Sequence, residues 1–382
     1  MSMDIFVTGL RVHTLFRELR RSTELSVRET SVSTVTPFER LTFDLEKLKA
    51  IAPVAFGDIS ASRPLEVLVP CDHMRRRASK IRTHLHSVAR KGSFMVLETN
   101  EDTLRNAGLP VDLRIYVDSP CRCFLNAAEL LACQIRSGQV DHSVALFRLI
   151  ALGSELCGTY SRDPARPYEG KIEYDVLPVC NAGAIRDFLK GCRRMRGIVL
   201  AREAAGYLVD GFRSPLECEF YYSLTLPARL GGIAFPKPLV NKRLKIRDRP
   251  GYLGSKDDGS RRSLVRHTRL TPDMQWSFPE VGLAMEVDGV SCHTDTKTFL
   301  DDRQRDQDYV LYGYKPLRVT YENVSSVEDL ERFLALIIKI LQPAFEKSRV
   351  KLFRRNLTSK RVQSLRGTLV SVFGPGRRAP DV

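Results

Sequence analysis

Residues 271–293, TPDMQWSFPEVGLAMEVDGVSCH, carry acidic side chains within a segment patterned as two short strands. The pattern predicts a hairpin that turns at its Pro-Glu pair, with Asp273 near the start of the first strand. Glu286 and Asp288 lie two apart at the end of the second strand, so both side chains leave the same face. The other face carries the apolar side chains that would pack on a core: Val281, Leu283, Met285 and Val287. The segment therefore favours a sheet that buries one face and gathers three acids.

Three carboxylates that lie together repel one another unless a cation lies among them. Hard divalent cations such as Mg²⁺ take oxygen ligands, so one interpretation of the hairpin is a metal site. The other is a surface hairpin whose acids are solvated. Spacing alone does not separate these two interpretations.

This hairpin and two other segments resemble the very-short-patch-repair-like branch of the PD-(D/E)xK nucleases. The hairpin matches as P-D, a few apolar or aromatic residues, P-E, an apolar run, E-V-D-G and then His293. Downstream, FLDDRQRDQDYVLYGYKPLRVT resembles the helix and following strand of the branch, and upstream S-P-L-E matches its helix start. The resemblance covers residues 206–341. Asp288 stands where the superfamily usually has Lys; this branch commonly has Asp there, which argues against a Lys-assisted mechanism.

The resemblance implies an α/β (α+β) fold, with a restriction-endonuclease-like mixed sheet flanked by helices. It also implies metal-dependent hydrolysis of phosphodiester bonds in DNA, with Mg²⁺ or Mn²⁺ as cofactor. Asp273 and Glu286 would be the principal ligands, and Asp288 would be a third ligand or would position water. His293 would accept a proton from the attacking water or hydrogen-bond a phosphate. The simpler alternatives are an Asp-Gly turn at Asp288 and a loop histidine without a task.

The resemblance gives supporting roles to four more residues. Glu217 would be an accessory acid near the metal, but Ser214, Pro215 and Glu217 also form a complete helix-capping sequence. The other three would support the ligands from behind or contact phosphate: Arg303, Asp306 and Arg318. Trp276, the only tryptophan, is expected to pack in the core rather than stack on a base.

The chain is strongly basic, with 60 Lys and Arg against 45 Asp and Glu and a net charge of +15. Such a charge attracts polyanions, so DNA is the predicted partner and a membrane is not. An RNA-processing nuclease would use the same chemistry, and the sequence does not separate the two. Phosphate contacts are predicted in two basic segments, one after a strand and one in the loop 247–269 that we expect over the substrate: Arg75, Arg76, Arg77, Lys80, Arg261, Arg262 and Arg266. Each run has the alternative of a solvated charged loop.

The expected location in the cell rests on two sequence features, a signal peptide and a membrane span, that we do not find in the pattern. The N-terminal residues do not have the apolar core of a signal peptide, and the longest apolar run near the C-terminus falls short of the roughly 20 residues of a membrane span. The nine cysteines are scattered without C-x-x-C spacing. We expect a cytoplasmic protein in a reducing compartment.

Periodicity and composition predict a helical segment at 1–60 and a basic tail at 346–382. Between them, the resemblances imply an α+β regulator-like domain at 61–195 and the nuclease domain at 196–345. The tail is expected to extend the preceding helix and then to be loose. The N-terminal half weakly resembles bacterial antitoxin or regulator-like domains at LEVLVP, MRRRASKIRTHLH and LGSELCGTY. It would dock DNA, a partner protein or a second copy of the chain. The alternative function is therefore a DNA-binding regulator whose nuclease-type domain is silent, although retention of all three acids favours an enzyme.

Overall fold

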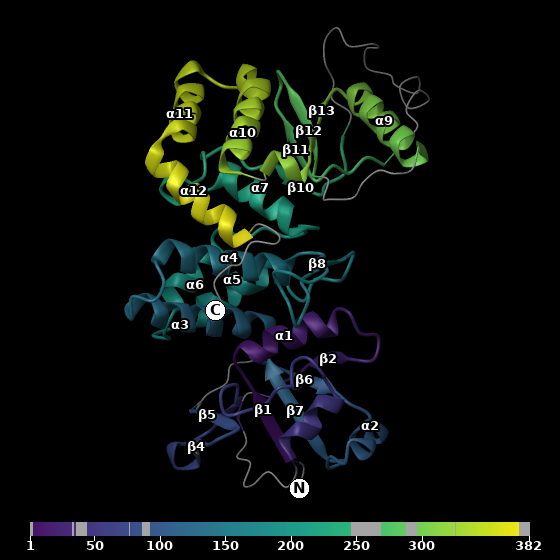
Figure 1. The fold of residues 1–382 in the computed structure, drawn as a ribbon, viewed down its shortest axis with the longest axis vertical. Coiled ribbons are helices and arrows are strands. Elements are labelled where there is room, and N and C mark those ends of the chain that lie inside the picture. The colour runs from purple at the N-terminus through teal and green to yellow at the C-terminus, as the bar shows by residue number, and fades with distance from the viewer. Residues whose placement is uncertain are drawn as a thin grey trace. The chain divides into compact units, whose positions relative to one another are not determined.

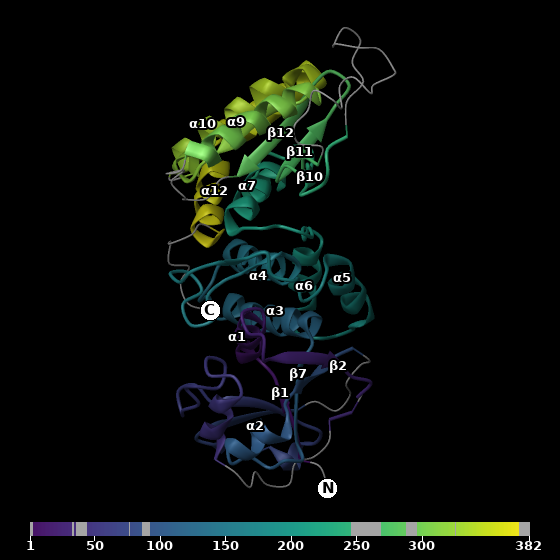
Figure 2. The ribbon, with the colours of Figure 1, turned by 90° about the vertical axis from the view of Figure 1, so that its right-hand side faces the viewer.

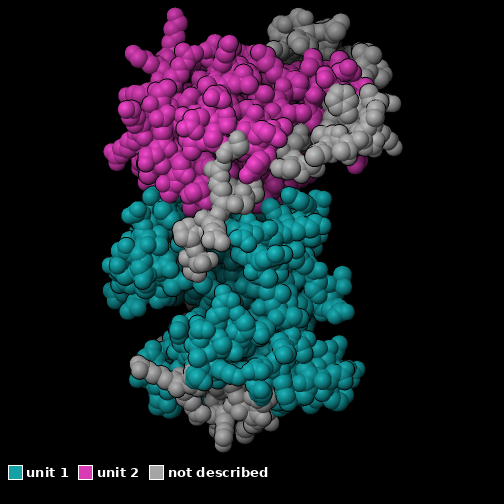
Figure 3. All heavy atoms as spheres, in the orientation of Figure 1, with its two compact units in different colours: residues 1–209, 378–382 teal, residues 210–377 magenta. Residues whose placement is uncertain are grey.

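The computed structural model describes residues 3–32, 34–35, 44–75, 77–85, 92–245, 269–287, 296–324 and 326–373. These residues form two compact units, unit 1 within Met1–Val209 and unit 2 within Asp210–Arg377 (Figure 3). Each unit has a mixed sheet flanked by helices, so the mixed α/β class expected from the sequence is confirmed.

Unit 1 is built on a seven-stranded sheet with strand order β2-β6-β7-β1-β3-β5-β4 (Figure 1). The central strand β1 pairs parallel with β7 and antiparallel with β3. Its apolar run is buried, and Phe6 stacks on Tyr116 of β7 with ring centroids 4.6 Å apart. The strands are β1 (Met3–Val7), β2 (Ser26–Glu29), β3 (Leu65–Val69), β4 (Arg77–Ala78), β5 (Ile81–Leu85), β6 (Phe94–Glu98) and β7 (Leu113–Asp118).

Most helices of unit 1 follow the sheet in the chain, and α3 to α6 form a helical cluster (Figure 2). The α3 helix begins with Ser119 as N-cap and Pro120 in its first turn, as a Ser-Pro start predicts. The α4 helix has buried side chains all around it, because other helices cover it on several sides. The helices are α1 (Leu10–Leu19), α2 (Glu101–Asn106), α3 (Pro120–Arg136), α4 (His142–Cys157), α5 (Ala182–Gly191) and α6 (Ile198–Ala205). Two 3-10 turns, η1 (Leu45–Ala50) and η2 (Asp72–Met74), and the small pair β8 (Tyr160–Ser161) and β9 (Glu173–Tyr174) complete unit 1.

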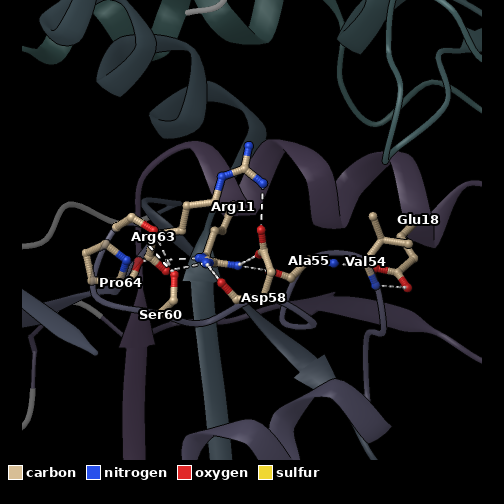
Figure 4. A network of polar contacts seen from close by, with 9 residues as sticks. Arg11, Glu18, Val54, Ala55, Asp58, Ser60, Arg63 and Pro64 are labelled. Carbon is tan, nitrogen blue, oxygen red and sulfur yellow. Dashed lines mark hydrogen bonds and ion pairs between the residues drawn. The ribbon is translucent and has the colours of Figure 1, made fainter. Parts of the chain in front are cut away.

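Residues 53–64 contain no helix or strand and are held by side chains of α1 (Figure 4). Arg11 donates to the carbonyl oxygens of Ala55 at 2.7 Å and Asp58 at 3.1 Å. Glu18 accepts from the backbone N of Val54 at 3.1 Å and of Ala55 at 3.0 Å. Backbone groups that a sheet or helix would otherwise satisfy are thus satisfied by two charged side chains.

Unit 2 has a four-stranded sheet in the order β10-β11-β12-β13, in which only β12 and β13 are parallel. The sheet lies between α9 and α10 (Figure 1). Its strands are β10 (Leu239–Val240), β11 (Met274–Ser277), β12 (Gly282–Val287) and β13 (Lys315–Val319). Its helices are α7 (Pro215–Thr225), α9 (Thr296–Leu311), α10 (Val327–Leu341), α11 (Lys347–Thr358) and α12 (Lys360–Phe373), with 3-10 turns η3 (Ala228–Leu230), η4 (Tyr321–Val324) and η5 (Gln342–Ala344).

The predicted hairpin is present as β11 and β12, but β12 is buried on both faces rather than one. Ala284, on the same face as Glu286, packs in a cluster with Tyr309 of α9 and with Tyr312 and Tyr314. Trp276 is buried, as expected, and its indole N–H donates to the carbonyl oxygen of Pro236 at 2.8 Å. The acid face is therefore covered by α9, which alternation along the strand did not indicate.

The two compact units differ from the four expected segments. Strand β1 and helix α1 belong to the same sheet and core as residues 61–209, so residues before 60 are not a separate helical segment. At the other end, the first part of the tail forms the separate helix α11 rather than extending α10, and residues 360–373 form α12 instead of being loose. Arg366 anchors α12: it is fully buried, pairs with Glu331 and donates to the carbonyl oxygen of Gly231 at 3.1 Å.

Candidate active site

The first acid of the site is Glu217, at the start of α7. Ser214 is the N-cap, and its Oγ accepts from the backbone N of Glu217 at 3.1 Å. The Glu217 carboxylate accepts from the backbone N of Arg213 at 3.0 Å and from Nδ2 of Asn241 at 2.9 Å. The predicted cap is confirmed, although the return bond reaches one residue before the N-cap. Glu217 is only 2% exposed, which a capping role on a surface helix would not require.

Asp273 and Glu286 are brought together by the register of the hairpin. Met274 pairs with Met285 in antiparallel strands, so Asp273, just before β11, comes opposite Glu286 near the end of β12. Side chains of directly opposed residues lie on the same face of a sheet. Oδ2 of Asp273 accepts from the backbone N of Val287 at 2.7 Å, which fixes one oxygen of that carboxylate. Both acids are largely buried.

Asn241 joins the helix start to the hairpin. Its backbone N donates to the carbonyl oxygen of Asp273 at 3.0 Å, and its side chain binds both Glu217 and the carbonyl oxygen of Gly211. The residue follows β10 with φ of 49°, a conformation that Asn tolerates better than most residues. The sequence pattern did not predict a role for Asn241, and an Asn directly after a short strand was the only local signal.

The α9 helix holds Glu286 from the other side. Nη2 of Arg305 donates to Oε1 of Glu286 at 2.9 Å, and the hydroxyl of Tyr309 donates to the same oxygen. Arg305 and Tyr309 are four residues apart, so they share one face of the helix. The resemblance assigned support from behind the ligands to Arg303 and Asp306 of this helix and did not point to Arg305 or Tyr309. The i, i+4 pair in RDQDY was the signal that could have found these two.

Two of the supporting residues suggested by the resemblance, Asp306 and Arg318, lie beside this contact. Asp306 of α9 accepts from Nη2 of Arg318 at 3.3 Å. Arg318 pairs with Glu286 across the parallel strands β12 and β13. Arg303 is exposed on α9. Arg318 and Asp306 thus form an ion pair beside Glu286, while Arg303 lies on an exposed part of the helix.

The charge of Asp273 acts on both Glu217 and Glu286. Burial, and then the charge of Asp273, raise the pKa of Glu217 to about 8. The same two causes, in the same order, raise the pKa of Glu286 to about 7, against the opposing effect of Arg305. Asp273 is therefore the centre of the group, and both glutamates hold protons near neutral pH when no cation is present.

Oxygen donors are the ligands that Mg²⁺ and Mn²⁺ prefer, and Asp273 and Glu286 fit that requirement by chemistry and proximity. Among the described residues, no three His, Cys, Asp or Glu side chains are already grouped as a complete metal site. Asp288 and His293, which the resemblance adds to the site, lie outside the described residues. The described part of the chain thus provides two carboxylates whose mutual repulsion a divalent cation would relieve.

Of the predicted phosphate-binding residues, the structure describes the side chains of Arg75 and Lys80, which belong to unit 1. Arg75 pairs with Asp72 at 3.4 Å and Lys80 pairs with Glu46 at 2.5 Å, all in unit 1. Each of these two cations thus has an acidic partner, in an exposed ion pair of the kind that contributes little to stability. The others lie outside the described residues or have side chains that do: Arg76, Arg77, Arg261, Arg262 and Arg266, together with most of the loop 247–269.

The exposed face of α11 is a more concentrated cationic surface. Four exposed cations follow helical spacing of i, i+4, i+7 and i+8: Lys347, Lys351, Arg354 and Arg355. The residues 347–373 contain no acid. The opposite face of α11 is anchored, because Phe353 is buried and Nδ2 of Asn356 donates to the carbonyl oxygen of Ile233 at 3.2 Å. We call these four cations the α11 surface.

Comparison of the chain with protein-family models, with curated proteins and with solved structures gives no match. Among the described residues, none of the helices has the length and apolar character to cross a membrane.

Proposed function

We propose that unit 2 is a metal-dependent endonuclease that hydrolyses phosphodiester bonds in DNA, with a restriction-endonuclease-like fold. The observation that carries the proposal is the position of Asp273 between two buried glutamates whose pKa values it raises. Strong perturbation of neighbouring carboxylates concentrates at functional sites, because such an arrangement costs stability. The sequence resemblance over residues 206–341 also assigns Asp273 and Glu286 as metal ligands and Glu217 as an accessory acid.

Asp273 and Glu286 would hold Mg²⁺ or Mn²⁺, with Asp288 as the third ligand or the residue that orients water. The cation, when bound, polarises the phosphoryl oxygen and lowers the pKa of a bound water. The chain orients both ligands before any cation arrives: Val287 fixes Asp273, and Arg305 and Tyr309 fix Glu286. Glu217, with a pKa of about 8, keeps a proton at neutral pH and so adds no further charge until a cation lowers that pKa.

The substrate class follows from charge. The α11 surface presents four cations without an acid on its helix, and the whole chain carries +15. A surface of this kind attracts the phosphate backbone without reading sequence. Duplex DNA is the substrate that the proposal commits to.

The test is cleavage of supercoiled plasmid with Mg²⁺ or Mn²⁺ by wild type, Asp273→Asn and Glu286→Gln. Glu280→Gln is the matched control, since Glu280 is an exposed acid of the same hairpin. Folding is checked by the fluorescence of the buried Trp276. Nicking that is lost in the first two variants and kept in the control supports the proposal. Equal nicking by all four proteins would refute it.

One observation favours the second candidate, a DNA-binding regulator with a silent nuclease-type domain. Glu286 already has Arg305 and Tyr309 as partners, and Glu217 has Asn241 and the Arg213 backbone. Protein groups therefore satisfy oxygens that a metal would use. Calorimetric titration with Mn²⁺ separates the two: wild type that binds DNA, binds no Mn²⁺ and cuts nothing supports the regulator.

A further inference from the structure

Three thiols from separate segments meet in unit 1. Cys121 lies in the first turn of α3, Cys157 is the last residue of α4, and Cys180 lies just before α5. The Sγ atoms of Cys157 and Cys180 are 3.9 Å apart. Cys121 lies close enough to Cys157 for the two thiols to interact electrostatically. Cys157 is buried, while Cys121 and Cys180 are partly exposed, so an oxidant reaches the cluster through the latter two.

The approach of Cys180 to Cys157 is fixed by the backbone. The backbone N atoms of Val179 and Cys180 both donate to the carbonyl oxygen of Leu156, at 3.1 and 3.3 Å. The chain that leaves α4 at Cys157 therefore returns beside it before α5 begins. The two sulfurs are 3.9 Å apart, and a disulfide of about 2.0 Å requires the two side chains to rotate toward each other.

The guanidinium group of Arg20 binds the backbone around this pair of cysteines. Arg20 donates to the carbonyl oxygens of Glu155 at 2.9 Å, Gly158 at 2.6 Å and Leu177 at 2.9 Å. It thereby binds both the end of α4 and the segment just before Cys180. The charge of Arg20 also interacts with the Cys180 thiol. A nearby cation favours the thiolate, which is the nucleophile in thiol–disulfide exchange.

We propose that Cys157 and Cys180 are a modification site that forms a reversible intramolecular disulfide on exposure to a low-molecular-weight disulfide such as oxidised glutathione. The Cys180 thiolate attacks one sulfur of oxidised glutathione, forming a mixed disulfide and releasing the first glutathione thiol. The Cys157 thiolate then attacks the Cys180 sulfur and releases the second. The two protons lost by the cysteines end on the two glutathione thiols, so the protein is oxidised by two electrons and one oxidised glutathione is reduced.

The bond would close residues 157–180 into a loop. That loop carries β8, β9 and Arg162, whose backbone N donates to the Glu155 carboxylate at 3.0 Å. It also carries the most exposed large apolar side chain among the described residues, Leu177, which is 85% exposed. Oxidation would therefore fix an otherwise non-covalently held surface segment to the end of α4, independently of any activity of unit 2.

Peptide mapping tests the pair directly. Native protein is incubated with oxidised glutathione, free thiols are alkylated at acid pH, and the protein is digested with trypsin. The expected product is a disulfide-linked pair of the peptides 149–162 and 172–186, each of which contains a single cysteine. Dithiothreitol should separate them. Linkage of 149–162 to 115–122, which contains Cys121, or glutathione on separate peptides without linkage, would overturn the assignment.

Two variants provide controls. Cys180→Ser should abolish the linked peptide, and Cys121→Ser should retain it. The midpoint of thermal unfolding, followed by circular dichroism, should rise by a few degrees on oxidation of wild type and of Cys121→Ser, and should not change for Cys180→Ser. A rise of equal size in Cys180→Ser would show that another cysteine is responsible and would refute the proposal.

Discussion

Buried acids in the two units have opposite surroundings. In unit 1, Glu155 accepts two hydrogen bonds from Arg17, both at 2.8 Å, and one from the backbone N of Arg162. These cations hold the pKa of Glu155 far below its usual range despite complete burial. In unit 2, burial has the largest effect on the pKa of Glu217, and the charge of another acid, Asp273, has the next largest. Both raise this pKa.

The difference separates a structural acid from a candidate functional one. A buried carboxylate with a guanidinium partner and filled hydrogen bonds holds elements together. Buried carboxylates that lie beside one another repel and therefore destabilise the fold. Such an arrangement is typical of functional sites, where the negative charge can bind a cation. The same residue type thus has contrary effects on stability in the two units.

The largest expected effect is a reversal between two Glu→Gln substitutions. Glu155→Gln leaves Arg17 without its buried partner and should destabilise unit 1 by about 3–5 kcal/mol. Glu286→Gln should abolish cleavage but leave the metal-free stability of unit 2 unchanged or higher, because it removes repulsion with Asp273.

Urea unfolding measures both variants. Trp276 is the only tryptophan and reports unit 2, while circular dichroism reports both units. The distinction between the structural Glu155 and the candidate functional Glu286 would be wrong if both variants lost the same stability. The loss is read from fluorescence for Glu286→Gln and from circular dichroism for Glu155→Gln.

The next effect is an opposite response of the units to pH in metal-free protein. Glu217 has a pKa of about 8 when folded and 4.5 unfolded, so the folded state binds more protons between these values. Unit 2 should therefore lose stability as pH rises from 4.5 to 8, by up to a few kcal/mol. Glu217→Gln should reduce this dependence in urea unfolding followed by Trp276 fluorescence with a chelator present, and Glu286, whose pKa is also raised, to about 7, should account for the remainder. A wild-type midpoint that rises across this window would contradict the shift.

Unit 1 should respond in the other direction through His13. Burial, and then the charge of Arg17, lower the pKa of His13 from 6.5 to about 3. The unfolded chain binds a proton that the folded unit does not, so stability falls as pH drops from 6.5 towards 3. Asp118, whose pKa burial raises, acts in the opposite sense, so the comparison of wild type with His13→Gln isolates the histidine. Equal acid dependence of both proteins by circular dichroism would exclude His13 as the cause.

A smaller effect is expected at the α11 surface. Substitution of Lys351, Arg354 and Arg355 by Ala should weaken DNA binding and reduce the salt slope by about 0.9 for each phosphate that the variant no longer neutralises. Binding is measured by fluorescence anisotropy in chelator, so that no cleavage occurs. Arg332→Ala is the control, because Arg332 is an exposed cation that pairs with Asp329. Equal slopes for the triple variant and the control would place DNA elsewhere.

The smallest expected effect is at Glu18, a unit 1 acid that binds backbone N–H groups rather than a guanidinium. Glu18→Gln keeps one acceptor oxygen, so the cost should be about 1 kcal/mol. Proteolysis within residues 53–64 should quicken in this variant, since Val54 and Ala55 lose part of their anchorage. An unchanged rate would show that Arg11 alone holds the segment.

Local pattern was sufficient for several elements of this fold. The alternation within residues 271–293 placed strands β11 and β12, and Ser-Pro-Leu-Glu placed the start of α7. Each depends on residues within a few positions of one another, so the sequence carries the signal. Asp273 and Glu286 were also found from the hairpin pattern and the resemblance.

The tertiary structure decided which groups surround those acids. The rotation of α9 that directs Arg305 and Tyr309 to Glu286, and the return of β10 that places Asn241 on Glu217, depend on contacts between distant segments. The same is true of the basic C-terminal residues. Their composition predicts a loose tail, but Arg366 is buried against Glu331 and Gly231. The sequence by itself determined which residues carry charge and which local elements form. Only the packing of segments far apart in the chain decided whether a buried charge meets a partner or a repelling neighbour, because that depends on burial and distance rather than on order in the chain.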